Sequence, residues 1–174
     1  AVVAAAGLLL DSPAVVVGAM VIAPLVGPAL SASVGTVLDD GELFRRGLRL
    51  QVVGVALSVA SAAAFALLVR SIPLFPPGRD ITRIAEISGR ISPDFLSLIV
   101  ALGAGAAGIL SLSSGVSAAL VGVMIAAALI PPAAAAGIAI AWGEPFAALS
   151  AGVLVLVNVL AINLSALVTL RYIG

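Results

Sequence analysis

The stretch VGAMVIAPLVGPA at residues 17–29 decides the fold, because the chain contains it twice. The second copy, VGVMIAAALIPPA, occupies residues 121–133, 104 positions later. Valine, glycine, methionine, leucine, proline and alanine stand at matching places in the two copies. Each copy is part of an apolar run long enough to enter a membrane, and each is interrupted by proline near its middle. Paired interruptions of this kind indicate an internal repeat and point to where a site would lie.

The composition predicts an integral membrane domain. Of the 174 residues, 63% are hydrophobic and 9% are charged, and the mean hydropathy is +1.33. One small soluble core could not bury so much apolar surface. Because no segment alternates strictly between apolar and polar residues, we expect spanning helices and not the strands of a barrel.

The balance of charges and the absence of cysteine and histidine argue against several classes of function. Eight arginines balance eight acidic residues, so no basic surface predicts a nucleic-acid partner. Cysteine and histidine are both absent, which removes disulfides, thiol chemistry and the usual ligands of zinc and haem. We therefore expect no metal, no cofactor and no enzymatic activity.

The apolar runs predict six transmembrane helices. Ala1 starts inside an apolar run that covers about half of a bilayer core of about 30 Å, so we expect the first span to begin upstream. The other predicted spans cover residues 14–38, 45–70, 94–112, 116–141 and 146–170. Proline removes a backbone donor and clashes with the preceding turn, so the second and fifth helices should be broken.

The order of these segments predicts two inverted repeats within a single domain. Asp39-Asp40 aligns with Gly143-Glu144 at the offset of 104, so each repeat holds a whole span, a broken span, an acidic turn and another whole span. Because three is odd, the second repeat must enter the membrane from the opposite side. The repeats cover residues 1–70 and 93–174, and residues 71–92 link them.

The linker carries the pattern of a short amphipathic helix. Ile81, Ile84 and Ile87 fall on one side of a helix, and Arg83 and Glu86 fall on the other. We expect this helix to lie at the membrane surface. Arg79, Arg83, Glu86 and Arg90 have helical spacing, and we interpret them as a solvated face in preference to a ligand site.

Small residues predict close helix packing. Gly54, Ser58 and Ala62 lie four apart in the third span, and the fourth span contains ALGAGAAG at residues 101–108. Both patterns favour close approach of another helix, and we expect a homo-oligomer in the lipid bilayer. In the sixth span, a buried Asn158 needs a partner, and we favour a neighbouring helix over a polar solute.

The broken helices predict a site near the bilayer midplane for a small polar solute, and so a transporter or channel. Lipid cannot satisfy the backbone groups that a break exposes, whereas a bound solute can. Half-helix N-termini favour a small anion or a zwitterion. We expect substrate-binding residues at Asp11, Ser12, Pro24, Gly27, Pro28, Ser31, Pro131, Pro132, Asn158 and Asn163.

Two alternatives stay open at this point. Asp11 could serve as a proton or cation site, but capping of the next helix explains it equally well. The whole domain could also be a non-transporting module that serves assembly or signalling beside a soluble domain, because proline kinks also occur for packing alone.

The residues around both proline motifs resemble a known family. The stretches GLLLDSPAVVVGAMVIAPLVGP at 7–28 and SAALVGVMIAAALIPP at 117–132 are similar to the bacterial hydrophobic proteins of domain of unknown function family 389 (DUF389). The resemblance implies a multi-pass protein of the bacterial inner membrane, often with a soluble domain ahead of the first span. It implies no substrate and no site residues.

Overall fold

The computed structural model describes residues 1–22, 26–72, 80–92, 94–114 and 118–173, and these contain helices and no strand. The helices are α1 (Val2–Leu9), α2 (Pro13–Val21), α3 (Val26–Val37), α4 (Gly41–Ser71), the 3₁₀ helix η1 (Ile81–Arg83), α5 (Ala85–Ser88), α6 (Phe95–Ser114), α7 (Ala118–Trp142) and α8 (Pro145–Ile173).

Three of the described helices are long and apolar enough to cross a membrane. They are α4, α8 and the part of α7 from Val121 to Trp142. The apolar part of α6 that the structure describes in full, Phe95–Ser111, is shorter. Helices α1, α2 and α3 have 8, 9 and 12 residues, and about 20 are needed to cross the hydrocarbon core. The membrane-protein class is supported, and the count of six spans stays a prediction.

The first helix of the second span ends before the first proline, as expected. Helix α2 ends at Val21 and α3 begins at Val26, and Pro24 lies outside the described residues. Pro28 stands in the first turn of α3, where backbone N–H groups have no partner inside the helix. Proline is therefore tolerated at this position.

The interruption expected in the fifth span is absent, and this prediction is wrong. Helix α7 continues through Pro131 and Pro132. Every residue from 125 to 139 except the half-buried Ala127 is buried, so neighbouring helices surround this part of α7 on all sides. Tertiary packing therefore holds a helix that local preference would interrupt.

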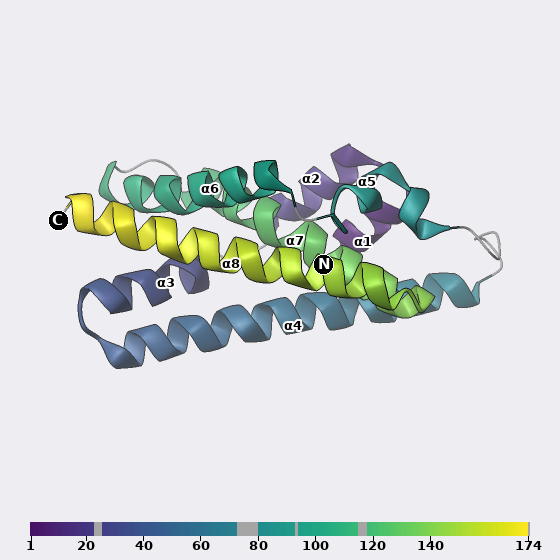
Figure 1. Cartoon of the computed structure of the whole chain (residues 1–174), viewed down its shortest axis with the longest axis horizontal. Coiled ribbons are helices and arrows are strands. Elements are labelled where there is room, and N and C mark those ends of the chain that lie inside the picture. The colour runs from purple at the N-terminus through teal and green to yellow at the C-terminus, as the bar shows by residue number, and fades with distance from the viewer. Residues whose placement is uncertain (23–25, 73–79, 93, 115–117, 174) are drawn as a thin grey trace.

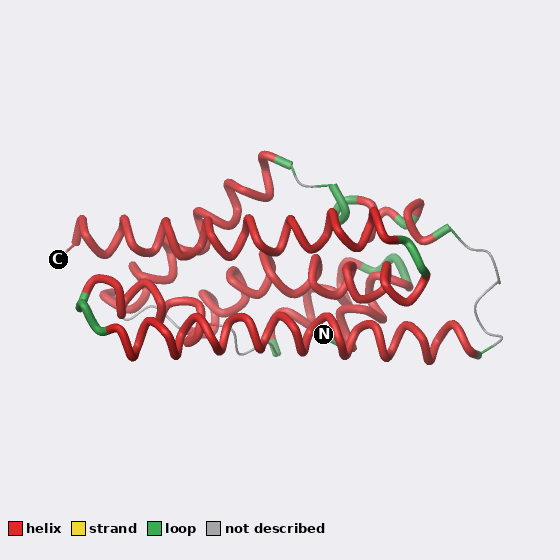
Figure 2. The backbone as a smooth tube through the Cα atoms, turned by 60° about the horizontal axis from the view of Figure 1, so that its bottom comes forward, coloured by secondary structure: helices red, strands yellow, loops and turns green. Residues whose placement is uncertain are grey.

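Helix α7 forms the centre of the bundle. Helices α4 and α8 both pack against it, α3 packs against α4 and α8, and α6 packs along α8. The long helices lie along one axis (Figure 2). Helix α4 runs from the left end to the right end, and α8 runs back from right to left (Figure 1). The offset of 104 aligns the first residues of these two helices, Gly41 and Pro145.

The small-residue face predicted at residues 101–108 is confirmed as a packing surface. Ala101, Ala104, Gly105 and Gly108 are buried, and a Cβ atom at Gly105 would overlap the Ile162 carbonyl of α8. The stripe predicted on α4 is only partly buried. Ala62 is enclosed, whereas Gly54 and Ser58 are half-buried.

The linker helix predicted at the membrane surface differs from what the structure shows. Residues 81–88 form two short turns, η1 and α5, and not one helix. Ile81, Ile84 and Ile87 are at most 4% exposed and belong to the same core cluster as Leu8 of α1. The isoleucine face therefore packs on the protein and does not face the lipid.

Replacement of Gly137 by alanine should destabilise the bundle. A Cβ atom at Gly137 would lie 2.5 Å from the Val59 carbonyl oxygen and 2.8 Å from the Ala62 Cβ on α4. Overpacking of this kind costs about 1–3 kcal/mol, and thermal unfolding in detergent would show it as a lower Tm. Gly103→Ala is the control, because nothing lies within 4 Å of a Cβ atom there. An equal Tm for both variants would contradict the close α4–α7 contact.

Candidate functional site

Asn158 of α8 compensates for a donor that α7 lacks. Its side chain is 3% exposed, and Nδ2 donates a hydrogen bond of 2.8 Å to the Ala128 carbonyl oxygen. In a regular helix that carbonyl would accept from the N–H of residue 132, which is proline and has none. The neighbouring-helix partner expected for Asn158 is thereby confirmed. The Asn158 Oδ1 atom is buried and has no hydrogen-bond partner among the described residues.

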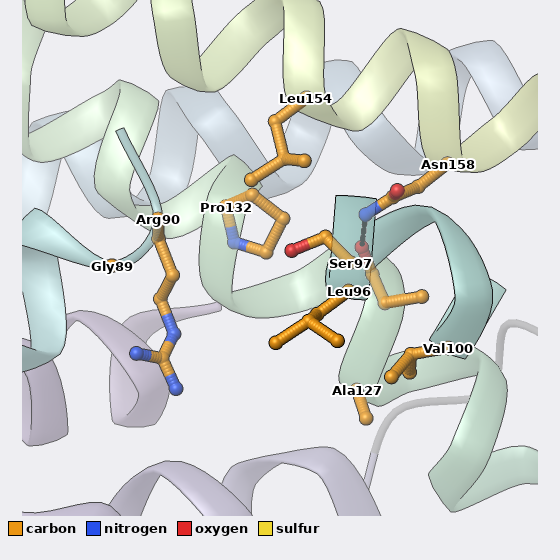
Figure 3. A pocket seen from close by; sticks show the side chains of 10 residues that line it. Gly89, Arg90, Leu96, Ser97, Val100, Ala127, Pro132, Leu154 and Asn158 are labelled. Carbon is orange, nitrogen blue, oxygen red and sulfur yellow. Dashed lines mark hydrogen bonds between the residues drawn. The ribbon is translucent and has the colours of Figure 1, made fainter. Parts of the chain in front are cut away.

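A pocket of about 270 Å³ lies beside this hydrogen bond. Segments far apart in sequence form its walls (Figure 3). Its lining residues are Gly89 and Arg90 after α5, Leu96, Ser97 and Val100 of α6, Ala127, Ala128 and Pro132 of α7, and Leu154 and Asn158 of α8. Arg90 lies on one side of the pocket and Asn158 on the other, with Pro132 and Ser97 between them (Figure 3). Three polar side chains therefore share one otherwise apolar pocket.

Arg90 reaches this pocket from the short helix α5. Its Nη2 atom lies 3.0 Å from Glu86 Oε2, and its Nη1 donates a hydrogen bond of 2.7 Å to the Glu86 carbonyl oxygen. The two side chains are 26% and 16% exposed. The solvated face expected here is confirmed for Arg83, whose side chain is 86% exposed, and is wrong for Glu86 and Arg90, because burial of Ile84 and Ile87 brings this pair into the protein. Arg79 lies outside the described residues.

Asp11 has a capping role, but at another helix than the one that the sequence suggested. It stands in the turn between α1 and α2 at a positive φ of 52°, and its Oδ1 accepts a hydrogen bond of 2.9 Å from the Glu86 backbone N–H. It therefore caps α5 and not the following helix. Ser12 is the N-cap residue of α2, and its side chain makes no capping hydrogen bond.

A second polar cluster joins α3, α4 and α8. Asn163 Nδ2 donates to Gln51 Oε1 at 3.2 Å, and Ser33 Oγ donates to the Asn163 carbonyl oxygen at 3.0 Å. Gln51 Nε2 is buried and has no hydrogen-bond partner among the described residues. The cavities beside this cluster, lined by Asn163 and by Gln51, are otherwise mainly aliphatic. This cluster connects helices and offers no charged group.

The ten expected site residues do not meet in one place. Pro132 and Asn158 line the pocket, and Pro131 is buried next to Pro132. Asn163 belongs to the second cluster. Gly27, Pro28 and Ser31 lie on α3, where the Ser31 hydroxyl donates to the Gly27 carbonyl oxygen at 2.6 Å. Among the described residues, none from the first proline motif lines the pocket. The described part of the site thus belongs to the second copy.

Arg90 and Ser97 are pocket residues that the sequence did not assign to the site. The Glu86–Arg90 spacing predicted a pair, but its burial depends on contacts with α1 that no local pattern shows. Ser97 is one of several hydroxyls in apolar helices, and nothing in the sequence distinguishes it.

Asp80 organises the start of the segment that carries Arg90. Its Oδ1 accepts from the Thr82 hydroxyl and backbone N–H at 2.5 and 3.0 Å, and its Oδ2 accepts from Arg83 Nε at 3.0 Å. The hydrogen bonds from Thr82, with a smaller contribution from Arg83, lower the pKa of the exposed Asp80 carboxyl. The ionised carboxylate is thus the form that this turn stabilises.

These features define a helical membrane protein with a polar pocket at a proline-containing helix. The family described as Domain of unknown function (DUF389) matches residues 20–164, and the chain belongs to this family. The chain is 38% identical over 169 residues to the uncharacterized protein MJ0678 of Methanocaldococcus jannaschii. The match covers 96% of this chain and 49% of that protein. This relative is archaeal, so the comparison does not support a bacterial source. No solved structure matches the chain significantly.

The link between Asn158 and Pro132 can be tested by a double-mutant cycle. Asn158→Leu leaves the Ala128 carbonyl without a donor and should cost about 1 kcal/mol of unfolding free energy. In a Pro132→Ala background the backbone N–H is restored, so the same substitution should cost less. Unfolding in detergent of the four proteins gives the coupling energy. Additive effects would show that Asn158 does not replace the missing donor.

Acid should weaken the η1 turn through Asp80. The folded-state pKa of Asp80 is lowered, so its stabilising contribution is present above the unfolded-state pKa of about 3.9 and is lost as pH falls through the folded-state pKa. Tm measured between pH 6 and pH 2.5 should fall more for the natural chain than for Asp80→Asn. Parallel curves for the two proteins would contradict a role for this carboxylate.

Proposed function

We propose that the chain forms the membrane part of a transporter or channel that binds a small polar solute in the pocket between α6, α7 and α8. The observation that carries this proposal is the pocket of about 270 Å³ with Arg90, Ser97 and Asn158 in its walls. Asn158 stands near the middle of α8, a helix long enough to cross a membrane. This position favours a site near the bilayer midplane.

The chemistry of the bilayer supports this interpretation. Ionisable and amide side chains are costly inside a membrane, and those that persist usually pair with one another or face a water-filled cavity. Non-helical backbone at membrane depth likewise occurs only where protein or a water-filled cavity supplies hydrogen-bond partners for its N–H and C=O groups. Gly89 and Arg90 follow α5 outside any described helix and line the pocket. They fit that description.

The internal repeat also favours transport. Helices α4 and α8 begin at equivalent residues and run in opposite directions (Figure 1). We propose six spans, formed by α1, the α2–α3 pair, α4, α6, α7 and α8, in two inverted repeats. In such proteins one repeat rocks against the other around a fixed site. The described residues that line the pocket belong to the linker and to α6, α7 and α8 of the second repeat.

The exposed apolar side chains indicate what surrounds the domain. Large apolar side chains on the outer sides of α4 and α8 are exposed, including Leu57, Leu68, Leu156 and Leu160. We propose that lipid and a second copy of the chain cover this surface, because water would not stabilise it.

Solute uptake into proteoliposomes tests the proposed function. A panel of radiolabelled small polar solutes would be compared for the natural protein, for Asn158→Leu and for Leu156→Ala as an exposed control on the same helix. At least one solute should enter above the protein-free background, with uptake at least tenfold lower in Asn158→Leu and unchanged in the control. Background uptake of every solute by the natural protein would refute transport.

A further inference from the structure

We infer that the solute is a zwitterion with no net charge, held with its carboxylate toward Arg90 and its ammonium toward Asn158. The inference rests on the proposed function, because it names the class of substrate for the same pocket. Three observations carry it: the charges around Arg90, the donors that Arg90 still offers, and the acceptors on the opposite wall.

The charges near the pocket disfavour a net anion. The Glu86 carboxylate already neutralises Arg90 at 3.0 Å. Two further carboxylates, both on exposed residues, stand near it. Asp11 accepts from the Glu86 N–H, and Asp94 accepts from the N–H of the pocket residue Ser97 at 2.7 Å. An added anion would leave an uncompensated negative charge in this partly apolar pocket, which is costly, whereas a zwitterion adds none.

Arg90 still has donors for a carboxylate. A guanidinium carries five N–H groups in a planar fork. One N–H of Nη1 donates a hydrogen bond to the Glu86 carbonyl oxygen, and Nη2 lies in an ion pair with Glu86 Oε2 that is not a hydrogen bond, so four N–H groups take part in no hydrogen bond within the described part of the chain. This fork matches the two oxygens of a carboxylate.

The opposite wall offers acceptors. Asn158 Oδ1 has no donor among the described residues, because the amide nitrogen of the same side chain is turned to Ala128. Ala127 also lines the pocket, and position 131, which would donate to its carbonyl in a regular helix, is proline. Neutral oxygen acceptors of this kind suit an ammonium group, which has three N–H donors and no acceptor.

The pocket volume of about 270 Å³ is large enough for a small solute. A short amino acid fits this space together with a few waters. Leu96, Val100 and Leu154 give the remaining wall an apolar surface for a short side chain.

Matched probes test the inference in proteoliposomes of the full chain. Radiolabelled glycine, L-alanine, L-serine and β-alanine would each be compared with the hydroxy acid of the same carbon skeleton: glycolate, L-lactate, L-glycerate and 3-hydroxypropionate. Each pair differs in having an ammonium or a hydroxyl, so the second member is a net anion. At least one amino acid should enter at least tenfold faster than its hydroxy acid partner.

Two substitutions locate the effect at this pocket. Arg90→Gln should lower uptake of that amino acid at least tenfold, whereas Arg83→Gln, with a side chain 86% exposed, should leave it unchanged. Glu86→Gln removes the neutralising carboxylate and should raise uptake of the hydroxy acid relative to the amino acid. This gain cannot arise from misfolding.

The outcomes separate the inference from the proposed function. Uptake of the hydroxy acids equal to or faster than that of the amino acids, with both sensitive to Asn158→Leu, would overturn the zwitterion and leave the transporter. Entry of some other polar solute of the wider panel, with none of the four amino acids above background, would also overturn it. Background uptake of every solute tried would refute the proposed function as well.

Discussion

The hydrogen bond from Asn158 to the Ala128 carbonyl oxygen is the contact on which the centre of the molecule depends. A membrane interior contains no water to satisfy a backbone group, so a proline inside a buried helix must be compensated by protein. Asn158 supplies that donor and joins α8 to α7 at the same point. Asn158 therefore contributes both to the helix and to the pocket. Its amide nitrogen donates to the Ala128 carbonyl oxygen, and its Oδ1 atom has no donor among the described residues.

The parts of the fold that were predictable from the sequence are those that depend on composition and on patterns within a few neighbouring residues. The helical membrane class, the end of α2 before the first proline and the small-residue face of α6 follow from hydropathy, proline and glycine within a few turns. The continuity of α7 was not predictable, because it depends on a side chain 26 positions beyond Pro132 that packs from another helix. Propensity within one segment carries no information about such a partner.

The same distinction holds for the site. Pro132 and Asn158 could be selected from sequence, because a proline and an asparagine are each conspicuous inside an apolar run. Arg90 could not be assigned to the pocket from the sequence. Its position there depends on the burial of three isoleucines of the linker and on the capping of α5 by Asp11, 75 residues away. Because of these non-local contacts, the charged residue in the pocket is Arg90 of the linker and not Asp11, the charged residue expected from the sequence.

The two copies of the repeat differ at the position that supplies a donor to the proline-containing helix. The offset of 104 places Gly54 of α4 at the position that Asn158 has in α8, and Pro28 at the position of Pro132. Glycine has no side chain and cannot donate to a carbonyl of the neighbouring helix. In the first copy the helix ends at Val21 and restarts at Val26, whereas in the second copy it continues. The donor that supports the proline-containing helix α7 thus has no counterpart in the first copy, and it stands beside the described pocket.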